Sequence, residues 1–297
     1  YIGQVLSAVM MVAMMMVMLV MSRASMARIT EVLAEKPSIN DDDAKDIAVT
    51  DGSIEFDDVS FSYNGNPDNP NLEHIKLKIA SGETIGIIGG TGSAKSTLVQ
   101  LIPRLYDVTS GAVKVAGHNV KEYKIQTLRH SVSMVLQKNV LFSGTIKENL
   151  KWGNADATDA EIEEACRAAA ADGFIKGFPD GYDTELGQGG VNVSGGQKQR
   201  LCIARALISK PKIIILDDST SAVDTATDAA IRKALSEELS STTTIIIAQR
   251  IASVMDADRI VIMNEGKIDD VGTHAELMQR SEIYREVYYS QQKGVEE

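Results

Sequence analysis

Residues 89–97 have the types and spacing needed to hold a polyphosphate; they are Gly89, Gly90, Thr91, Gly92, Ser93, Ala94, Lys95, Ser96 and Thr97. An apolar stretch at 84–88 precedes them, and a helix-like apolar pattern through Leu98 and Ile102 follows. Small residues let the backbone approach phosphates closely, and the N–H groups at a helix start point toward them. In such a loop Lys95 reaches the β- and γ-phosphates, and the Ser96 hydroxyl binds Mg²⁺. The loop therefore predicts nucleoside-triphosphate binding, the alternative being a glycine-rich turn without a ligand.

One position departs from the pattern G-x-x-x-x-G-K-[ST]. Counting from Gly89, the residue before Lys95 is Ala94 rather than glycine. Alanine fits there if the residue is already helical, and it is strained only if φ is positive.

A second candidate site follows the apolar stretch 213–216, which ends in the carboxylates Asp217 and Asp218. Ligands of a parallel sheet bind at the carboxyl ends of its strands, the edge where the phosphate loop also lies. We expect Asp217 to hold Mg²⁺, through water, and Asp218 to polarise an attacking water. The alternative is a pair of solvated acids in a loop.

A third candidate is Ser194-Gly195-Gly196-Gln197, directly before a predicted helix at 197–208. The N–H groups and the positive dipole end there form an anion site. Because one phosphate loop serves one nucleotide, a second cradle indicates that two chains share ligands across an interface. The alternative is an ordinary helix N-cap.

The surrounding elements predict an α/β fold. Apolar residues alternate with polar ones at 54–61 and 75–79, which is typical of an antiparallel sheet with one wet face. Short strands are expected at 112–115 and 133–136, and a helix at 158–171 that starts with a capping box. Three apolar, β-branched stretches, 213–216, 243–247 and 260–263, predict parallel strands that are covered on both faces.

The N-terminal run 1–22 contains no charged residue. About 20 apolar residues span a bilayer, so this run predicts a transmembrane helix with Arg23 and Arg28 on its cytoplasmic side. A buried core helix is the alternative. An amphipathic helix at 25–35 and an acidic linker at 36–51 follow. Because the chain opens on Tyr1, we expect a fragment or a processed product.

The composition further limits the domain organisation, the partners and the disulfide content that can be expected. A chain of 297 residues exceeds the usual size of a single core, so one large domain with an appendage is expected. Acidic residues outnumber basic ones by 41 to 30, which argues against a nucleic-acid partner. The two cysteines, Cys166 and Cys202, indicate no disulfide framework.

Together these motifs resemble the nucleotide-binding domain of an ATP-binding cassette (ABC) exporter, joined to the last transmembrane helix of its membrane domain. The resemblance covers essentially the whole chain. It implies a P-loop NTPase ABC fold with a mixed or parallel core sheet, an antiparallel β subdomain and a helical subdomain at about 138–208. The implied division is 1–35 for the membrane helix and its extension, 36–53 for a linker, 54–290 for the domain and 291–297 for a tail.

The resemblance also implies roles for single residues. It makes 89–96 the Walker A motif, 213–217 the Walker B motif and 193–197 the signature that binds the partner's nucleotide. Gln137 resembles the Q-loop glutamine, a Mg²⁺ ligand, and Tyr63 resembles the aromatic residue on which adenine stacks. Asp224 resembles the D-loop aspartate, which contacts the partner's Walker A. The implied cofactors are ATP and Mg²⁺.

Two departures from the family pattern carry information. Asp218 stands where strongly hydrolysing members have glutamate, and Gln249 stands in place of the switch histidine. Glutamine can hydrogen-bond a γ-phosphate but cannot become cationic. Both changes together resemble the degenerate, slow site of a heterodimeric multidrug-type exporter of the bacterial cytoplasmic membrane. Its partners would be a second exporter half and the transmembrane domains of both halves.

Two other functions remain alternatives. One is a soluble ABC-type ATPase that acts on nucleic acid or translation, which the apolar N-terminal helix and the acidic balance oppose. The other is a nucleotide-sensing regulatory module without useful turnover. For an exporter, drugs, lipids and peptides are all open as cargo.

Overall fold

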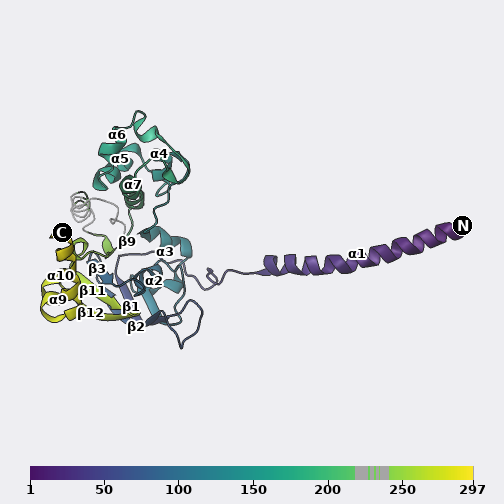
Figure 1. The fold of residues 1–297 in the computed structure, drawn as a ribbon, viewed down its shortest axis with the longest axis horizontal. Helices are drawn as coiled ribbons and strands as arrows, with labels where there is room; N and C mark the ends of the chain where they lie inside the picture. Colours follow the sequence, from purple (N-terminus) through teal and green to yellow (C-terminus); the bar gives the residue numbers. More distant parts are fainter. Residues whose placement is uncertain (218–226, 228–230, 232–233, 235–240, 297) are drawn as a thin grey trace. The chain divides into compact units, whose positions relative to one another are not determined.

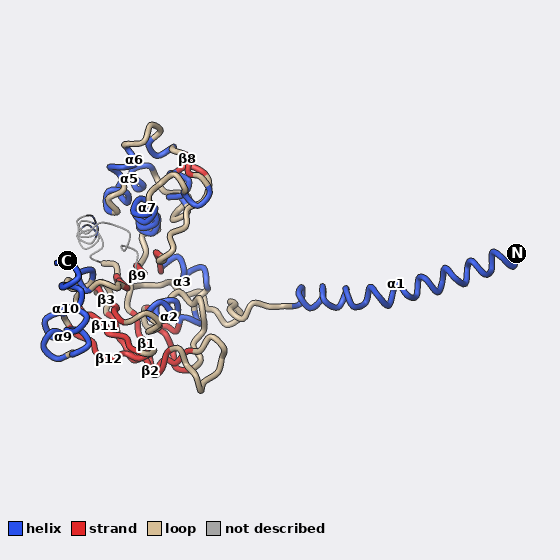
Figure 2. Tube along the Cα trace, viewed as in Figure 1, coloured by secondary structure: helices blue, strands red, loops and turns tan. Residues whose placement is uncertain are grey.

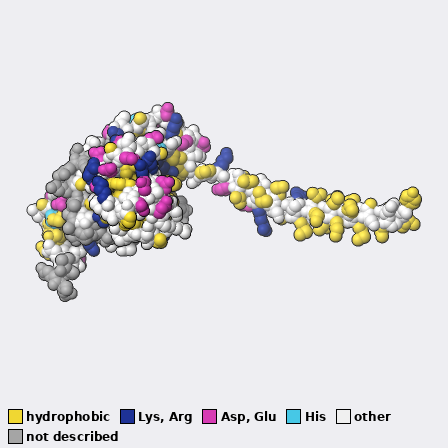
Figure 3. Space-filling view, turned by 90° about the horizontal axis from the view of Figure 1, so that it is seen from above, with side chains coloured by type: hydrophobic (Ala, Val, Ile, Leu, Met, Phe, Trp, Pro, Cys, Tyr) yellow, Lys and Arg dark blue, Asp and Glu magenta, His cyan; other side chains and the backbone are white. Residues whose placement is uncertain are grey.

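The chain forms two units in the computed structural model, which describes residues 1–217, 227, 231, 234 and 241–296. They are Tyr1–Asn40 and Asp41–Glu297. Helix α1 (Ile2–Ala34) makes up most of the first unit and is continuous through the apolar and the amphipathic stretches. It is long and apolar enough to cross a membrane, with a mean hydropathy of 2.4 in its most apolar window. Figure 3 shows apolar side chains along its length.

A six-stranded sheet forms the centre of the second unit (Figures 1 and 2), in the order β12-β11-β3-β10-β9-β6. Neighbouring strands from β11 to β6 run parallel, and β12 pairs antiparallel with β11. The predicted parallel strands at 213–216, 243–247 and 260–263 are confirmed, whereas the antiparallel edge strand was not predicted. The strands are β3 (Thr84–Gly89), β6 (Val132–Val135), β9 (Ile213–Asp217), β10 (Thr243–Ile247), β11 (Arg259–Asn264) and β12 (Lys267–Gly272).

Strand β9 shows that this sheet is covered on both faces. Ile213 and Ile215 belong to one apolar cluster, which also includes the antiparallel sheet. Ile214 and Leu216 belong to another, which includes the helices after β6. Since successive strand residues point to opposite faces, the continuous apolar sequence of β9 is what a doubly covered strand requires.

A four-stranded antiparallel sheet, in the order β2-β1-β4-β5, lies against this core. Ile75, Leu77 and Ile79 are buried, whereas Lys76 and Lys78 are exposed, so the predicted wet face is confirmed. The strands are β1 (Ile54–Phe61), β2 (Leu72–Ile79), β4 (Ser110–Val115) and β5 (His118–Asn119).

The helical part lies between β6 and β9 in the sequence, and α7 (Gly195–Ile208) packs against α4 (Ile146–Lys151) and α5 (Asp159–Ala168). The expected single helix at 158–171 was wrong at its end. Its capping box is present, but Ala170 has φ +52°, and a new helix, α6 (Asp172–Lys176), follows. A residue in the left-handed region ends a helix because the hydrogen-bond ladder cannot continue through it.

The remaining elements are short except for the C-terminal helix. The short strands β7 (Gly144–Thr145) and β8 (Glu185–Leu186) pair with each other. Helix α10 includes most of the residues 291–297, which were expected as a tail. The helices are α2 (Lys95–Gln100), α3 (Ile125–Ser131), α9 (His274–Arg280) and α10 (Glu282–Glu296), with 3₁₀ turns at Val120–Glu122, Gly181–Asp183, Gln188–Gly190 and Ile251–Ser253.

The acidic stretch expected as a linker is partly attached to the second unit. Asp41 Oδ1 accepts a hydrogen bond of 2.8 Å from Ile125 N–H at the start of α3, and Lys45 forms an ion pair with Glu122. Residues 41–45 therefore help to fix the entry of the chain into this unit.

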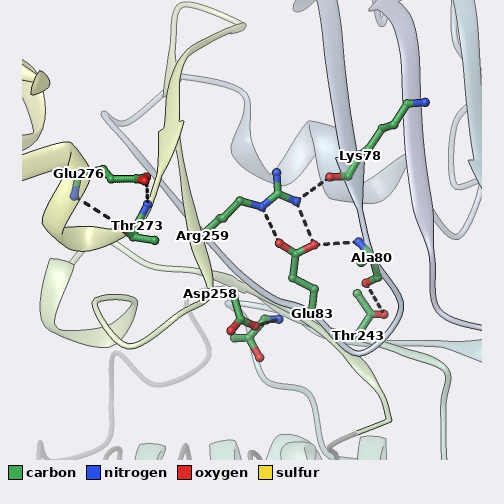
Figure 4. A network of polar contacts seen from close by, with 9 residues as sticks. Lys78, Ala80, Glu83, Thr243, Asp258, Arg259, Thr273 and Glu276 are labelled. Carbon is green, nitrogen blue, oxygen red and sulfur yellow. Dashed lines mark hydrogen bonds and ion pairs between the residues drawn. The ribbon is translucent and has the colours of Figure 1, made fainter.

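A polar network centred on Glu83 joins β2 to β11 (Figure 4). Arg259 Nη2 donates to Glu83 Oε2 at 2.9 Å and to Lys78 O at 2.7 Å, while Ala80 N–H donates to Glu83 Oε2 at 2.8 Å. Burial alone raises the pKa of Glu83, but these hydrogen bonds and the Arg259 charge hold the pKa below its usual value. The ion pair thus fixes the turn that leads into β3 and the phosphate loop.

Candidate functional site

A cavity of about 430 Å³ lies at the carboxyl ends of β3, β9, β10 and β11. This is the edge at which α/β sheets bind ligands. Six of the predicted site residues with polar side chains line it: Thr91, Lys95, Ser96, Gln137, Gln249 and, at the end of β9, Asp217. The complete lining is Ile88, Gly89, Gly90, Thr91, Gly92, Lys95, Ser96, Gln137, Asp217, Ile247, Gln249, Ile262, Met263, Asn264, Ile283 and Val287.

The phosphate loop needs glycine at two positions for different reasons. A Cβ at Gly89 would lie 2.2 Å from Met263 O, so the close approach to β11 excludes a side chain. Gly92 has φ +84°, a conformation that residues with a Cβ rarely adopt. These two glycines let the chain turn from β3 to α2 while its backbone stays open to the cavity.

Lys95 extends back over this loop. Its Nζ donates to Gly89 O at 2.8 Å, to Gly90 O at 2.9 Å and to Ser93 Oγ at 3.3 Å. The ammonium group is thereby fixed at the cavity wall, where it can neutralise the charge of a bound polyphosphate.

An alanine at position 94 would be free of strain if the residue were helical. Ala94 is not helical. It has φ +67° and ψ 24°, which is the left-handed region, and it precedes the first helical residue of α2. An L-residue with a Cβ pays for this conformation, so the loop carries local strain at the position where the motif has glycine.

Asp217 and Ser96 meet at one point of the cavity. Burial raises the pKa of Asp217, and a hydrogen bond with the Ser96 side chain and the Lys95 charge oppose the rise. The Ser96 hydroxyl and the Asp217 carboxylate are in contact, and the Gln137 side chain lines the same cavity. All three carry oxygen atoms of the kind that Mg²⁺ prefers as ligands. The residues present therefore fit a Mg²⁺ ion that is completed by phosphate oxygens and water.

Four predicted residues in or beside the loop do not line the cavity: Ser93, Ala94 and Thr97 within the loop, and Tyr63 beside it. Tyr63 is about half exposed, and its hydroxyl is 3.1 Å from Thr97 Oγ1, on the first turn of α2. Its ring contacts Tyr106 edge-on at a centroid distance of 5.1 Å. Ser93 and Thr97 are buried. Tyr63 thus presents an exposed aromatic ring next to the phosphate loop, where a base could stack.

The signature residues do not line this cavity. Ser194 caps α7, because its Oγ accepts from Gln197 N–H at 3.3 Å while Gln197 Oε1 accepts from Ser194 N–H at 2.9 Å. Gly195 and Gly196 form the first turn of α7, and Ser194 and Gly195 are exposed. The N-cap expected as the simple alternative is therefore present, on a surface that a second chain could reach.

Asp218 and Asp224, predicted to activate water and to contact a partner, lie outside the described residues. The sequence-based prediction missed Asn264, Ile283 and Val287 as lining residues. Ile283 and Val287 lie four residues apart in an apolar pattern, so their spacing indicated one helix face, but no local signal connects that face with the cavity.

Comparison with known proteins agrees with this arrangement. Residues 72–221 match the model of the family described as ABC transporter. The chain is 46% identical, over 245 residues, to a protein of Staphylococcus aureus strain NCTC 8325 described as a multidrug export ATP-binding/permease protein. The match covers 82% of this chain and 42% of that protein, so the chain spans less than half the length of these relatives.

A solved structure of a bacterial Atm1-family ABC exporter with ATP bound has the same fold. Its TM-score is 0.84 at 34% sequence identity, and the match covers 90% of this chain and 46% of that one. The relative of S. aureus strain bovine RF122 is 44% identical over the same length. The chain belongs to the ABC transporter family and contains that family's ATPase domain.

Proposed function

We propose that the cavity at the phosphate loop binds Mg-ATP and hydrolyses it. The observation that carries this proposal is the convergence of Lys95, Ser96, Gln137, Asp217 and Gln249 on one cavity at the sheet edge. The backbone from Gly90 to Thr97, together with Tyr63, would hold the nucleotide. Ser96, Gln137 and Asp217 would hold Mg²⁺, which would supply positive charge to offset that of the phosphates while the γ-phosphoryl group is transferred to water.

Each residue would act in a defined way. Lys95 would neutralise the β- and γ-phosphates, and Ser96, Gln137 and Asp217 would hold the metal ion. Gln249 would donate a hydrogen bond to the γ-phosphate. Asp218 would orient and polarise the attacking water.

The phosphate-loop assignment predicts that ATP binding depends on Lys95. Lys95→Ala should weaken Mg-ATP binding strongly, measured by calorimetry, because the ammonium lies at the loop that would contact the phosphates. Lys76→Ala is the matched control, since it removes an exposed lysine of β2. Equal affinities of Lys95→Ala and the unaltered chain would show that the assignment is wrong.

We further propose that the chain is the ATP-binding subunit of an exporter in the bacterial cytoplasmic membrane. The apolar α1 would be the last helix of the membrane domain, and closure of two cassettes on ATP would move the attached helices. The relatives described as multidrug exporters support this proposal over a soluble ATPase acting on nucleic acid. Membrane fractionation of the full-length protein tests it, because recovery in the soluble fraction would contradict it.

The residues Asp218 and Gln249 support a finer proposal, a heterodimer in which this chain's own site is slow. The shorter carboxylate and the uncharged amide weaken water activation at that site. The second exporter half would carry glutamate and histidine at the two positions and would hydrolyse ATP faster. Sequencing the neighbouring gene tests the pairing, because a neighbour with the same two substitutions would contradict it.

A further inference from the structure

Helix α10 forms part of the wall of the nucleotide cavity. Ile283 and Val287 line the cavity, and Gln291 lies one further turn along the same face. Residues at i, i+4 and i+8 are neighbours on a helix surface, so these three side chains form a stripe. The C-terminal helix therefore faces the site through a continuous row of side chains.

The Gln291 side-chain amide pairs with the loop that follows β10. Its Nε2 donates to Gln249 O at 2.7 Å, and its Oε1 accepts from Ile251 N–H at 2.9 Å. Only one orientation of the amide satisfies both bonds, because the carbonyl of Gln249 needs a donor and the N–H of Ile251 an acceptor. The two bonds hold the backbone on both sides of residue 250.

The N-terminal part of α10 is held by packing and hydrogen bonds, so the helix can support the loop that follows β10. Tyr284 is fully buried, and its hydroxyl is 2.7 Å from His274 Nδ1 in α9. Its backbone N–H donates to Ser281 Oγ at 3.2 Å. Tyr284 also belongs to the apolar cluster that contains Ala248 and Ile251, the residues on either side of the 249–250 segment.

We propose that Gln291 is a positioning residue that holds Gln249 toward the γ-phosphate of bound ATP. Both bonds of Gln291 go to main-chain atoms, so they fix where residue 249 lies without using its side-chain amide. The Gln249 side chain, which lines the cavity, is then presented from a rigid segment. The inference rests on the proposed ATP-binding function and assigns α10 to the recognition of the triphosphate.

The chemistry of this contact gives a selective test. ADP lacks the γ-phosphate. A residue that positions Gln249 against that phosphate should therefore affect the affinity for ATP and leave the affinity for ADP unchanged. A general loss of folding would instead weaken both nucleotides. The ratio of ATP to ADP affinity therefore separates positioning from structural support.

The experiment uses the full-length protein that contains this chain, with Mg-ATP and Mg-ADP titrated by calorimetry. Gln291→Met keeps the side-chain length but removes both hydrogen bonds, and we expect ATP affinity to fall about tenfold, with ADP affinity unchanged within about twofold. The control Gln292→Ala removes an exposed amide that donates to Tyr288 Oη at 2.8 Å, and it should leave both affinities unchanged. Hydrogen exchange without nucleotide should be faster at the Ile251 amide in Gln291→Met alone.

A double variant shows whether Gln291 acts through Gln249. If it does, Gln249→Ala combined with Gln291→Met should bind ATP no more weakly than Gln249→Ala alone, because the two effects are not independent. Additive losses, equal losses of ATP and ADP affinity, or a Gln291→Met that behaves as Gln292→Ala would each overturn the proposal. If Lys95→Ala leaves ATP binding intact, the proposed function itself fails, which is a different result from any of these.

Discussion

At the scale of single residues, the phosphate loop contains a strained position. Ala94 has φ +67°, where glycine is accepted without the clash of a Cβ. Ala94→Gly should therefore stabilise the chain by up to about 1 kcal/mol, since relief of the left-handed conformation exceeds the added chain entropy. Chemical denaturation checks this.

The control is Ala204→Gly, in the buried interior of α7. Ala204→Gly should instead lower the free energy of unfolding, by about 1 kcal/mol or more, because glycine disfavours a helix and leaves a small void. If both variants were destabilised to the same extent, Ala94 would not be strained.

Tyr63 is the second residue whose role can be tested separately. Its exposed ring lies beside the phosphate loop, so Tyr63→Ala should weaken ATP binding by about 1–3 kcal/mol, the usual range for an aromatic–base stack. Tyr63→Phe should keep most of the affinity, since it loses only the contact with Thr97. Trp152→Ala, which removes an exposed aromatic residue elsewhere, is the control. An unchanged affinity in Tyr63→Ala would point to another adenine platform.

At the scale of elements, the Glu83–Arg259 pair should give stability that depends on pH. The pKa of Glu83 is lowered in the folded chain, so its contribution is present above the unfolded pKa of about 4.3 and is lost as pH falls through the folded pKa. Glu83→Gln should therefore cost about 1–2 kcal/mol near pH 7 and less at lower pH. The measurement is denaturation of both proteins over this pH range.

A matched control isolates the pair from the general effect of charge. Glu164→Gln removes one negative charge from an exposed glutamate of α5 and should change stability little at either pH. A difference between Glu83→Gln and the unaltered chain that stays constant down to acidic pH would contradict the linkage.

The elements also show what a sequence can and cannot predict. The strand β9 was predictable because its continuous apolar run, three β-branched isoleucines at 213–215 and then Leu216, is what a parallel strand covered on both faces requires. The end of α5 was not predictable, because the left-handed conformation of Ala170 has no signal in an alanine-rich stretch. The antiparallel strand β12 was missed, because its partial burial gives only a weak alternating pattern.

Some features of the candidate site were likewise predictable from the sequence, and others were not. Lys95, Ser96 and Asp217 were predicted because their motif places them at one edge of a parallel sheet. The strain at Ala94 and the wall formed by α10 were not, because both depend on how distant segments pack. Ile283, Val287 and Gln291 form a helix stripe in the sequence, but only the folded chain shows that the stripe faces the loop after β10.

At the scale of the whole molecule, we propose a division of labour between two chains. On this proposal, Asp218 and Gln249 would belong to the site built on this chain's own phosphate loop. Ser194, Gly195 and Gly196 keep the family pattern, and they would complete the site on the partner's phosphate loop. This chain should therefore host the slow site and complete the fast one.

The most direct measurement is steady-state ATPase activity of the full-length protein with an unaltered partner. Asp218→Ala should change turnover little, whereas Ser194→Ala should reduce it by roughly a hundredfold or more, the cost of removing a well-placed transition-state donor. Equal losses would favour symmetric sites. A large loss in Asp218→Ala with little loss in Ser194→Ala would contradict the account.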